Sequence, residues 1–410
     1  MALKLPKNAV TCIVAEPLFV IPYNMYTTYA SVYMLQQGLS SVQLGWFTTM
    51  NLVVQMISAA ASGYLTDRMG RRTALWVFDV LSWSCATLLW AISHTWIGFG
   101  LAFLLNGLQR IPTTAWYCLL TEDTPPLQRT RVFTLLQVVS TVAGFLAPLS
   151  GYLVHRLGLV PATRILYTYA FVSMTLMIVL RHLGLRETSI GLQRLAEARP
   201  WNLSEEIRRM GRVIRAIQQN RNLFWLFSLY VLWNIQASIR STFIPAYQMD
   251  GLMIPAWLMG TLPALSSLVM AICLVLWASR FQDHHGYRWM HLGLALLTVS
   301  ALLLCMSPPR SLAPTLMSTA LAAAGTVFAN PFVESMVANA LDDSERSTSL
   351  AVLNTLILLC SSPAGAIAGY LYAWHPRSTA VWTAIVMAAS MVCVEAARRL
   401  TRPTPTHPVQ

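Results

Sequence analysis

Long apolar stretches follow one another along almost the whole chain, and short polar segments separate most of them. A helix that crosses a membrane needs about 20 mainly apolar residues. We therefore predict spans over twelve ranges: 9–34, 42–66, 73–94, 97–119, 131–154, 163–183, 223–248, 255–280, 288–306, 312–340, 348–373 and 377–397. The pattern predicts an all-α membrane protein with twelve transmembrane helices.

One polar segment, 184–222, is much longer than the others and rich in arginine. It divides the chain into an N-terminal six-helix bundle over 1–183 and a C-terminal one over 223–397, with a tail at 398–410. Within this linker, Asn202 or Ser204 is a candidate helix cap ahead of two acids. Positions 203–217 predict a basic amphipathic helix on the inner membrane surface, with a solvated linker as the alternative.

The two halves repeat each other. Asp67 and Asp283 follow the second and eighth spans, 216 residues apart, and Gly151 and Gly369 lie 218 apart in the fifth and eleventh. The acidic turns at 122–123 and 342–343 are 220 apart. Secondary transporters are often built from internal repeats of this kind. The chain is therefore predicted to be two pseudo-symmetric bundles of six helices.

Composition and charge agree with a membrane protein. Hydrophobic residues make up 56% of the chain and charged residues 11%, which is too few to cover a soluble surface. The net charge of +12 could suggest nucleic-acid binding, but a cytoplasmic N-terminus places 22 of the 28 cations in cytoplasmic segments. This bias sets orientation. It predicts a cell-membrane protein with both termini cytoplasmic and no nucleic-acid partner.

The loop after the second span carries a distinctive string, G-x-L-x-D-R-x-G-R-R, from Gly63 to Arg72. It resembles the signature loop between helices 2 and 3 of the major facilitator superfamily, and a weaker copy follows the eighth span. The resemblance covers the whole chain and implies the fold of two six-helix bundles, of the bacterial type. It also implies a cytoplasmic gate. The residues predicted for this gate are Gly63, Asp67, Arg68, Gly70, Arg71, Arg72, Asp283, Gly286 and Arg288.

Each gate residue has a physical reason. Gly63 and Gly70 allow close helix approach and a tight turn. Asp67 can accept hydrogen bonds from a helix N-terminus or from an arginine of the other half. The alternative is a loop that only anchors topology.

The fifth span departs from the glycine–proline motif of the family's drug/proton antiporters, because Ala147 precedes Pro148. A kink or close-packing role remains, whereas the antiporter assignment is weakened.

Ionisable side chains inside spans are costly, at about 2.5–3.5 kcal/mol each on insertion scales, so they need a reason. The resemblance implies that helices 1, 4, 7 and 10 surround a central cavity, and each carries one such charge with amides nearby on the same face. The residues predicted for a substrate and proton cavity are Glu16, Asn24, Asn106, Gln109, Arg110, Gln236, Arg240, Asn330 and Glu334. Asp79, in the third helix, is assigned a structural role beside the arginines of the 63–72 loop.

Depth along the helices suggests pairs. Arg110 is expected to pair with Glu16 or Glu334, whereas Arg240 is expected to face the cavity without a fixed acid and to bind an anionic or hydroxyl-bearing solute. Glu16 or Glu334 is the hypothetical carrier of a coupling proton, released when Arg110 competes for the carboxylate. The alternative is a permanent bridge that only fixes helix packing.

Together these features predict a secondary transporter of a small solute, working by alternating access, and no enzyme. Proton-coupled export of small amphipathic compounds is favoured by the signature loop, the aromatic residues of the cavity helices and the buried acids. The alternatives are an importer or uniporter of a sugar or organic anion and a non-transporting sensor or scaffold. No nucleotide-binding string occurs and the seven cysteines are scattered. We expect no cofactor or metal, protons as the coupling ion, and a monomer in the lipid bilayer.

Overall fold

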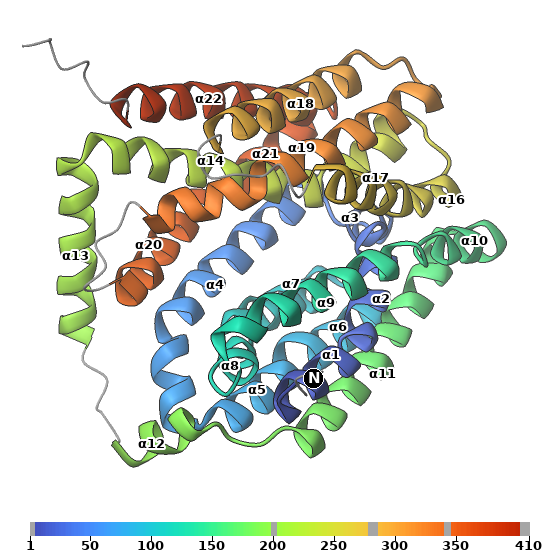
Figure 1. Ribbon diagram of the computed structural model, residues 1–410. Coiled ribbons are helices and arrows are strands. Elements are labelled where there is room, and N and C mark those ends of the chain that lie inside the picture. Colours follow the sequence, from blue (N-terminus) through green and yellow to red (C-terminus); the bar gives the residue numbers. More distant parts are fainter. Residues whose placement is uncertain (1–4, 198–202, 278–285, 340–345, 402–410) are drawn as a thin grey trace, which may run out of the picture.

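The computed structural model describes residues 5–197, 203–277, 286–339 and 346–401. In these ranges the regular secondary structure is helical, with no strand (Figure 1). The N half consists of α1 (Lys7–Ala15), α2 (Pro17–Thr27), α3 (Ala30–Gln36), α4 (Ser41–Met69), α5 (Arg71–Asp79), η1 (Val80–Cys85), α6 (Ala86–Ile92), α7 (Trp96–Asn106), η2 (Gly107–Gln109), α8 (Arg110–Thr121), α9 (Pro126–Gly144), α10 (Pro148–Leu157) and α11 (Leu159–Gly184).

The remaining helices form the linker and the C half. Helices α12 (Ser189–Glu197) and α13 (Leu203–Gln219) occupy the predicted linker, and α13 coincides with the predicted amphipathic helix. The C half consists of α14 (Arg221–Thr242), α15 (Ile244–Ala246), η3 (Tyr247–Gly251), α16 (Ala256–Met259), α17 (Thr261–Trp277), α18 (Gly286–Met306), α19 (Leu312–Asn339), α20 (Arg346–Ser361), α21 (Ala364–Trp374) and α22 (Ser378–Thr401).

Each of the twelve predicted spans coincides with a helix or with a run of consecutive helices. Within the described ranges, ten of these are long and apolar enough to cross a membrane. The two others, α7–α8 and α14, contain the half-buried arginines Arg110 and Arg240. The fold is therefore the predicted all-α membrane fold.

Prolines divide several spans into consecutive helices because a proline nitrogen cannot donate to the preceding turn. Pro17 begins α2 directly after Glu16, and Pro148 begins α10 after α9 has ended at Gly144. The break at Pro148 confirms the predicted kink in the fifth span. In the C half, Pro363 divides α20 from α21 at the equivalent place.

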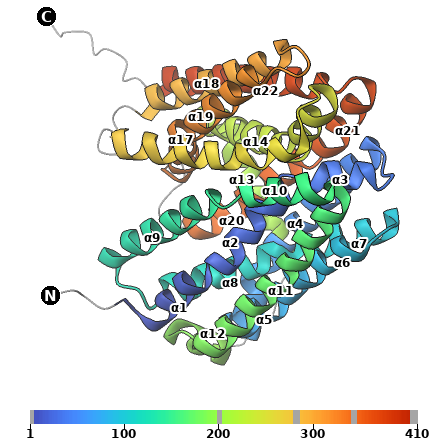
Figure 2. The same cartoon turned by 90° about the vertical axis from the view of Figure 1, so that its right-hand side faces the viewer.

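The two halves form separate groups of helices, blue to green and yellow-green to red, in both views (Figures 1 and 2). One end of the bundle carries Arg68, Arg71 and Arg72 between α4 and α5; we call it the basic face. The opposite face carries the turns between α3 and α4 and between α10 and α11.

Close backbone contacts join the halves near the opposite face. A Cβ atom built on Gly45 of α4 would lie 2.5 Å from the carbonyl oxygen of Gly365, and one on Gly151 of α10 would lie 2.2 Å from that of Trp257. Hydroxyls add to these contacts: Tyr29 Oη donates to the carbonyl oxygen of Ala256 (3.1 Å), and Thr49 Oγ1 to that of Ser362 (2.8 Å). Gly151 therefore has the close-packing role predicted for the fifth span.

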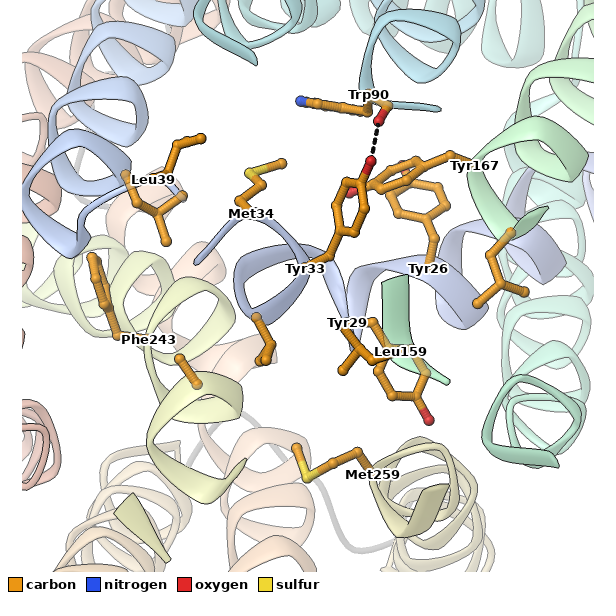
Figure 3. Close-up of a cluster of buried hydrophobic side chains, with 14 of the residues drawn as sticks. Tyr26, Tyr29, Tyr33, Met34, Leu39, Trp90, Leu159, Tyr167, Phe243 and Met259 are labelled. Carbon is orange, nitrogen blue, oxygen red and sulfur yellow. Dashed lines mark hydrogen bonds between the residues drawn. The ribbon is translucent and has the colours of Figure 1, made fainter. Parts of the chain in front are cut away.

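A cluster of buried side chains from both halves fills the space behind these contacts (Figure 3). Tyr29 and Tyr33 are fully buried, and Tyr33 Oη donates to the carbonyl oxygen of Trp90 (3.1 Å). Phe243 and Met259 join the same cluster from the C half. We call this cluster the plug, because it closes the centre of the molecule towards the opposite face.

Candidate functional site

A cavity of about 410 Å³ lies between the two halves, directly beneath the plug. Helices α2 and α9 line it from the N half, and α14, α17 and α19 line it from the C half. Met259 and Leu262 belong both to its wall and to the plug. A pocket of this size holds a small solute. It lies at the interface of the two halves and is closed on one side by the plug.

Hydroxyl and amide side chains dominate the polar lining of this pocket. The lining residues of these types are Asn24, Thr27, Thr28, Gln137, Ser140, Thr141, Gln236, Gln248, Ser266, Ser267, Ser300, Ser318, Thr319 and Thr383. Among the described residues, no aromatic ring and no carboxylate lines the pocket, and Arg240 is its one charged side chain. The pocket therefore offers hydrogen bonds and one positive charge.

Arg240 is held in the pocket by α14 and reaches towards α19, where Nη1 lies 3.5 Å from Thr326 Oγ1. No carboxylate pairs with it in the part of the chain that the structure describes. One turn earlier, Gln236 is 4% exposed, and its Oε1 has no hydrogen-bond partner among the described groups. Both side chains thus present unused polar groups to the pocket, as the sequence predicts for Arg240.

Three other predicted cavity residues lie outside the pocket lining, in a polar network between α4 and the α7–α8 junction. Arg110 Nε donates to Gln55 Oε1 (2.9 Å), and Gln55 Nε2 in turn donates to Asn51 Oδ1 (2.8 Å). The side-chain oxygen of Asn106 accepts from Asn51 (3.3 Å) and Gln109 (3.1 Å). This network binds two helices of the N half together at mid-depth.

Glu16 also lies outside the pocket lining, and its partner is not Arg110. Glu16 Oε2 accepts from Arg181 Nη2 at 2.6 Å. Asp79 lies 3.8 Å from the same guanidinium, through Oδ2 and Nη1, and not beside the arginines of the 63–72 loop. Arg181 stands in the last turn of α11, within reach of both α1–α2 and α5. It replaces Arg110 as the partner of Glu16 and the arginines of the 63–72 loop as the partner of Asp79.

The predicted residues of α19 are only partly described. Asn330 is half-buried and does not line the pocket, whereas the side chain of Glu334 lies outside the described residues. Of the nine predicted cavity residues, Asn24, Gln236 and Arg240 meet in the pocket.

Sequence reasoning missed the residues that complete the pocket, which come from α9, α17 and α18. Gln137, Ser140 and Thr141 form one polar group in the second half of α9, and Ser266 and Ser267 form another on α17. Small hydroxyls are ordinary in spans because they can bond the preceding turn of their own helix. Their grouping within a single turn was the available signal.

The predicted gate loop is ordered by partners within the N half and the start of the linker. Arg71 pairs with Asp67 (2.9 Å) and Glu122 (3.2 Å). Glu187 caps α5 by accepting the backbone N–H groups of Arg71 (3.0 Å) and Arg72 (3.1 Å). Asp67 and Arg71 are linked to no residue of the C half in the described ranges.

The remaining gate residues are less connected. Arg68 contacts Tyr64 one turn earlier on α4. In the second copy, Gly286 begins α18 and Arg288 is exposed on it, whereas Asp283 lies outside the described residues.

The two glycines of this loop are expected to respond differently to alanine. Gly70 has φ +84°, and a Cβ there would lie 2.8 Å from Glu187 Oε2, so Gly70→Ala should destabilise the protein by about 1–3 kcal/mol. Gly63 is exposed and a Cβ there meets nothing within 4 Å, so it is not a site of close helix approach. Gly63→Ala should leave stability unchanged or raise it. Thermal unfolding in detergent compares the two; equal losses would contradict this account.

No group of three or more histidine, cysteine, aspartate or glutamate side chains suited to a metal occurs in the described part of the chain.

Comparison with known proteins gives a family and a fold. A family model described as Major Facilitator Superfamily matches residues 18–280 and 258–410. No curated protein matches the chain closely enough to count as a relative. Among solved structures, a D323A mutant of the nucleoside transporter NupG aligns with a TM-score of 0.72 at 13% identity, over 97% of this chain and 100% of its own.

Two further structures are peptide-type transporters. The peptide transporter POT in complex with sulfate aligns with a TM-score of 0.70 at 16% identity, covering 96% and 94% of the two chains. A POT family transporter in complex with 5-aminolevulinic acid aligns with a TM-score of 0.72 at 12% identity, covering 97% of each chain. At these identities the likeness concerns the fold.

Proposed function

Because the chain belongs to the major facilitator superfamily and is a membrane transporter, we propose that it carries a small polar solute with an anionic group, held at Arg240. The observation that supports this most directly is the guanidinium of Arg240, which stands in the pocket without a carboxylate partner among the described residues. An arginine presents several donors in a fixed fork, which suits a carboxylate or phosphate. Asn24, Gln236 and the hydroxyls around it would bind hydroxyl or amide groups of the same solute.

The lining favours a sugar-like or organic-anion solute over the amphipathic compounds first preferred from the sequence. Aromatic rings of the cavity helices were one reason for that preference. Tyr26 and Trp233 belong instead to buried hydrophobic clusters and do not line the pocket. Gln236 Oε1 has no hydrogen-bond partner among the described groups, and an apolar solute would leave it without one, which costs about 1–3 kcal/mol.

The solutes named for the similar structures, a nucleoside for one and peptides for others, differ from each other. They support transport of small polar molecules in general, and the choice among polar solutes for this chain rests on Arg240 and its neighbours.

The state proposed for this structure is one open to the cytoplasm. The positive-inside rule assigns the basic face to the cytoplasm and both termini with it. The plug closes the other side, and among the described residues the gate loop is linked only within the N half and the linker. Solute would then enter from or leave to the basic face, and the halves would rock about the glycine contacts to expose it on the other side.

Protons are proposed as the coupling ion. Arg110 is bonded to Gln55 and does not contact Glu16, so the predicted release of a proton from Glu16 would need a cation other than Arg110. Glu334 remains a candidate carrier on α19.

Uptake by reconstituted protein tests the proposed function. Proteoliposomes would be loaded with pools of small carboxylates, of neutral sugars or of cationic amphipathic compounds, and exchange of labelled for unlabelled solute measured. We expect saturable exchange with the carboxylate pool, competed by its members and absent from empty liposomes. Exchange only with the amphipathic cations would overturn the assignment of the pocket to an anion.

A further inference from the structure

Three charged side chains from three spans meet inside the N half, away from the pocket lining. Glu16 lies at the junction of α1 and α2, Asp79 at the end of α5, and Arg181 in the last turn of α11. One guanidinium serves both carboxylates, at 2.6 Å from Glu16 and 3.8 Å from Asp79. We call these three residues the triad.

The triad is buried and its charges do not balance. The exposed fractions of the side chains are 15% for Glu16, 7% for Arg181 and 5% for Asp79. With both acids ionised, the cluster would hold a net negative charge in a membrane interior. Burying an uncompensated charge costs several kcal/mol or more, and such sites instead bind a proton. Two carboxylates that share one site behave in this way, with one of them retaining its proton.

Geometry distinguishes the two acids. Glu16 has the short, charge-assisted bond to Arg181, whereas Asp79 Oδ2 is buried with no hydrogen-bond partner among the described groups. Arg181 Nε is likewise buried without an acceptor. A protonated Asp79 would need no second cation, and its Oδ2, 3.8 Å from Arg181 Nη1, lies beyond hydrogen-bond distance of the guanidinium.

Within the described ranges, Asp79 has no ion pair other than that with Arg181. Cys12, one turn before Glu16, is the further titratable group within electrostatic range of the triad. The neighbouring His182 ring packs at a tilted angle against Trp76 of α5, with centroids 5.3 Å apart. The charge balance of the cluster therefore depends on Glu16, Asp79 and Arg181.

We propose that the triad is a proton-binding site in which the proton resides mainly on the Asp79 carboxyl in this conformation. Resting on the proposed function, the same proton is the one coupled to solute movement. When it leaves, Asp79 becomes a second anion competing for Arg181, which weakens the bond to Glu16. No bond other than the O–H bond of the carboxyl forms or breaks.

Helix α2 connects the triad with the pocket. Glu16 directly precedes α2, Asn24 and Thr27 of the pocket stand on this short helix, and Thr28 of the pocket follows directly after it. Helix α11 holds α2 at a second point, where Ser173 Oγ donates to the carbonyl oxygen of Leu18 (2.7 Å). A change in the Glu16–Arg181 bond would therefore alter how α2 sits against α11, and with it the N-half wall of the pocket.

The backbone next to Asp79 is also irregular. The π-helical segment η1 begins at Val80, directly after Asp79, and ends at Cys85. Such segments often occur at functional sites, because they interrupt regular helix bonding and let a segment change register. Asp79, whose charge would change, is therefore directly followed by a segment of the third span whose backbone can change conformation.

Infrared difference spectroscopy of the purified protein, with no solute present, tests the proton directly. At neutral pH the wild type should show the carbonyl stretching band of a buried, protonated carboxyl. Asp79→Asn should remove this band, and Glu197→Gln, which removes an exposed acid on α12, should leave it in place. A wild-type protein without the band, or a band lost in Glu16→Gln but kept in Asp79→Asn, would overturn the assignment. Should Asp79→Asn fail to fold, Asp79→Glu keeps a carboxyl there and should shift the band.

A second measurement separates this proposal from the proposed function. Asparagine mimics the neutral acid, so binding of the carboxylate pool to Asp79→Asn should lose the pH dependence seen in the wild type. Absence of carboxylate binding by the wild type would refute the solute assignment while leaving the infrared result intact. Carboxylate binding with the same pH dependence in wild type and Asp79→Asn would refute the coupling role of the triad.

Discussion

Replacement of Arg240 by glutamine should weaken binding of the transported anion by about 10- to 100-fold, because a hydrogen bond to a charged group contributes about 1.5–3 kcal/mol. The guanidinium is the one charge of the described pocket lining, and a carboxylate brought there by the solute would lose its counter-charge. Arg240→Lys keeps the charge but not the fork of donors, so its affinity for the anion should lie between that of the wild type and that of Arg240→Gln. Equilibrium binding of the carboxylate pool measures all three proteins.

Arg110→Gln provides the matched comparison. Both arginines are half-buried in spans that the family places around the cavity, but Arg110 is bonded to Gln55 and lies outside the pocket lining. We expect Arg110→Gln to lower thermal stability while solute affinity stays near that of the wild type. An equal loss of affinity in the two variants would show that the solute site extends to the α7–α8 junction.

Replacement of Gly151 by valine should force the halves apart at the opposite face. A Cβ there would lie 2.2 Å from the carbonyl oxygen of Trp257, and the obstacle is backbone that cannot move aside. Overpacking of even a side-chain contact typically costs about 1–3 kcal/mol. This conformation would therefore become a minor one, and the pocket should open away from the basic face.

Cysteine accessibility would reveal this shift. In a background without the seven native cysteines, Thr27→Cys places a thiol in the pocket lining. A membrane-impermeant thiol reagent added on the side of the opposite face should label it rapidly in Gly151→Val and slowly otherwise. Leu149→Val is the control, since that side chain is 57% exposed on the same helix. Slow labelling in Gly151→Val, with the protein folded, would contradict closure at this contact.

Gly260→Ala, whose Cβ would lie 2.7 Å from the Gly151 nitrogen, tests the contact from the other half.

The fold was largely predictable because its signals are local. Stretches of apolar residues give the spans directly, and Pro148 gives the break between α9 and α10, since proline acts on its own helix. The repeat and the signature loop then fix the family without any knowledge of contacts.

The site was predictable only in part, because it depends on how helices are turned towards each other. Depth along a helix placed Glu16 and Arg110 at comparable levels, but it could not show that they face different neighbours. Arg181 was counted among the cations that set orientation, although it lies in the last turn of a span and is 6% exposed. Arg240 was correctly expected to face the cavity because no acid stood near its level on the neighbouring helices.

The start of the linker carries a consequence for biosynthesis. The backbone N–H of Arg186 donates to Asn8 Oδ1 (3.0 Å), Glu187 caps α5, and Thr188 donates to Glu122. All of these partners precede residue 189 in the chain, and none belongs to the C half. The N half can therefore form these contacts at its basic face while the ribosome is still making the linker, before α14 enters the membrane. Domains commonly fold as units in the order in which they are synthesised. The C half would then be inserted beside a finished neighbour, whose glycine surfaces on α4 and α10 are already in place to receive it.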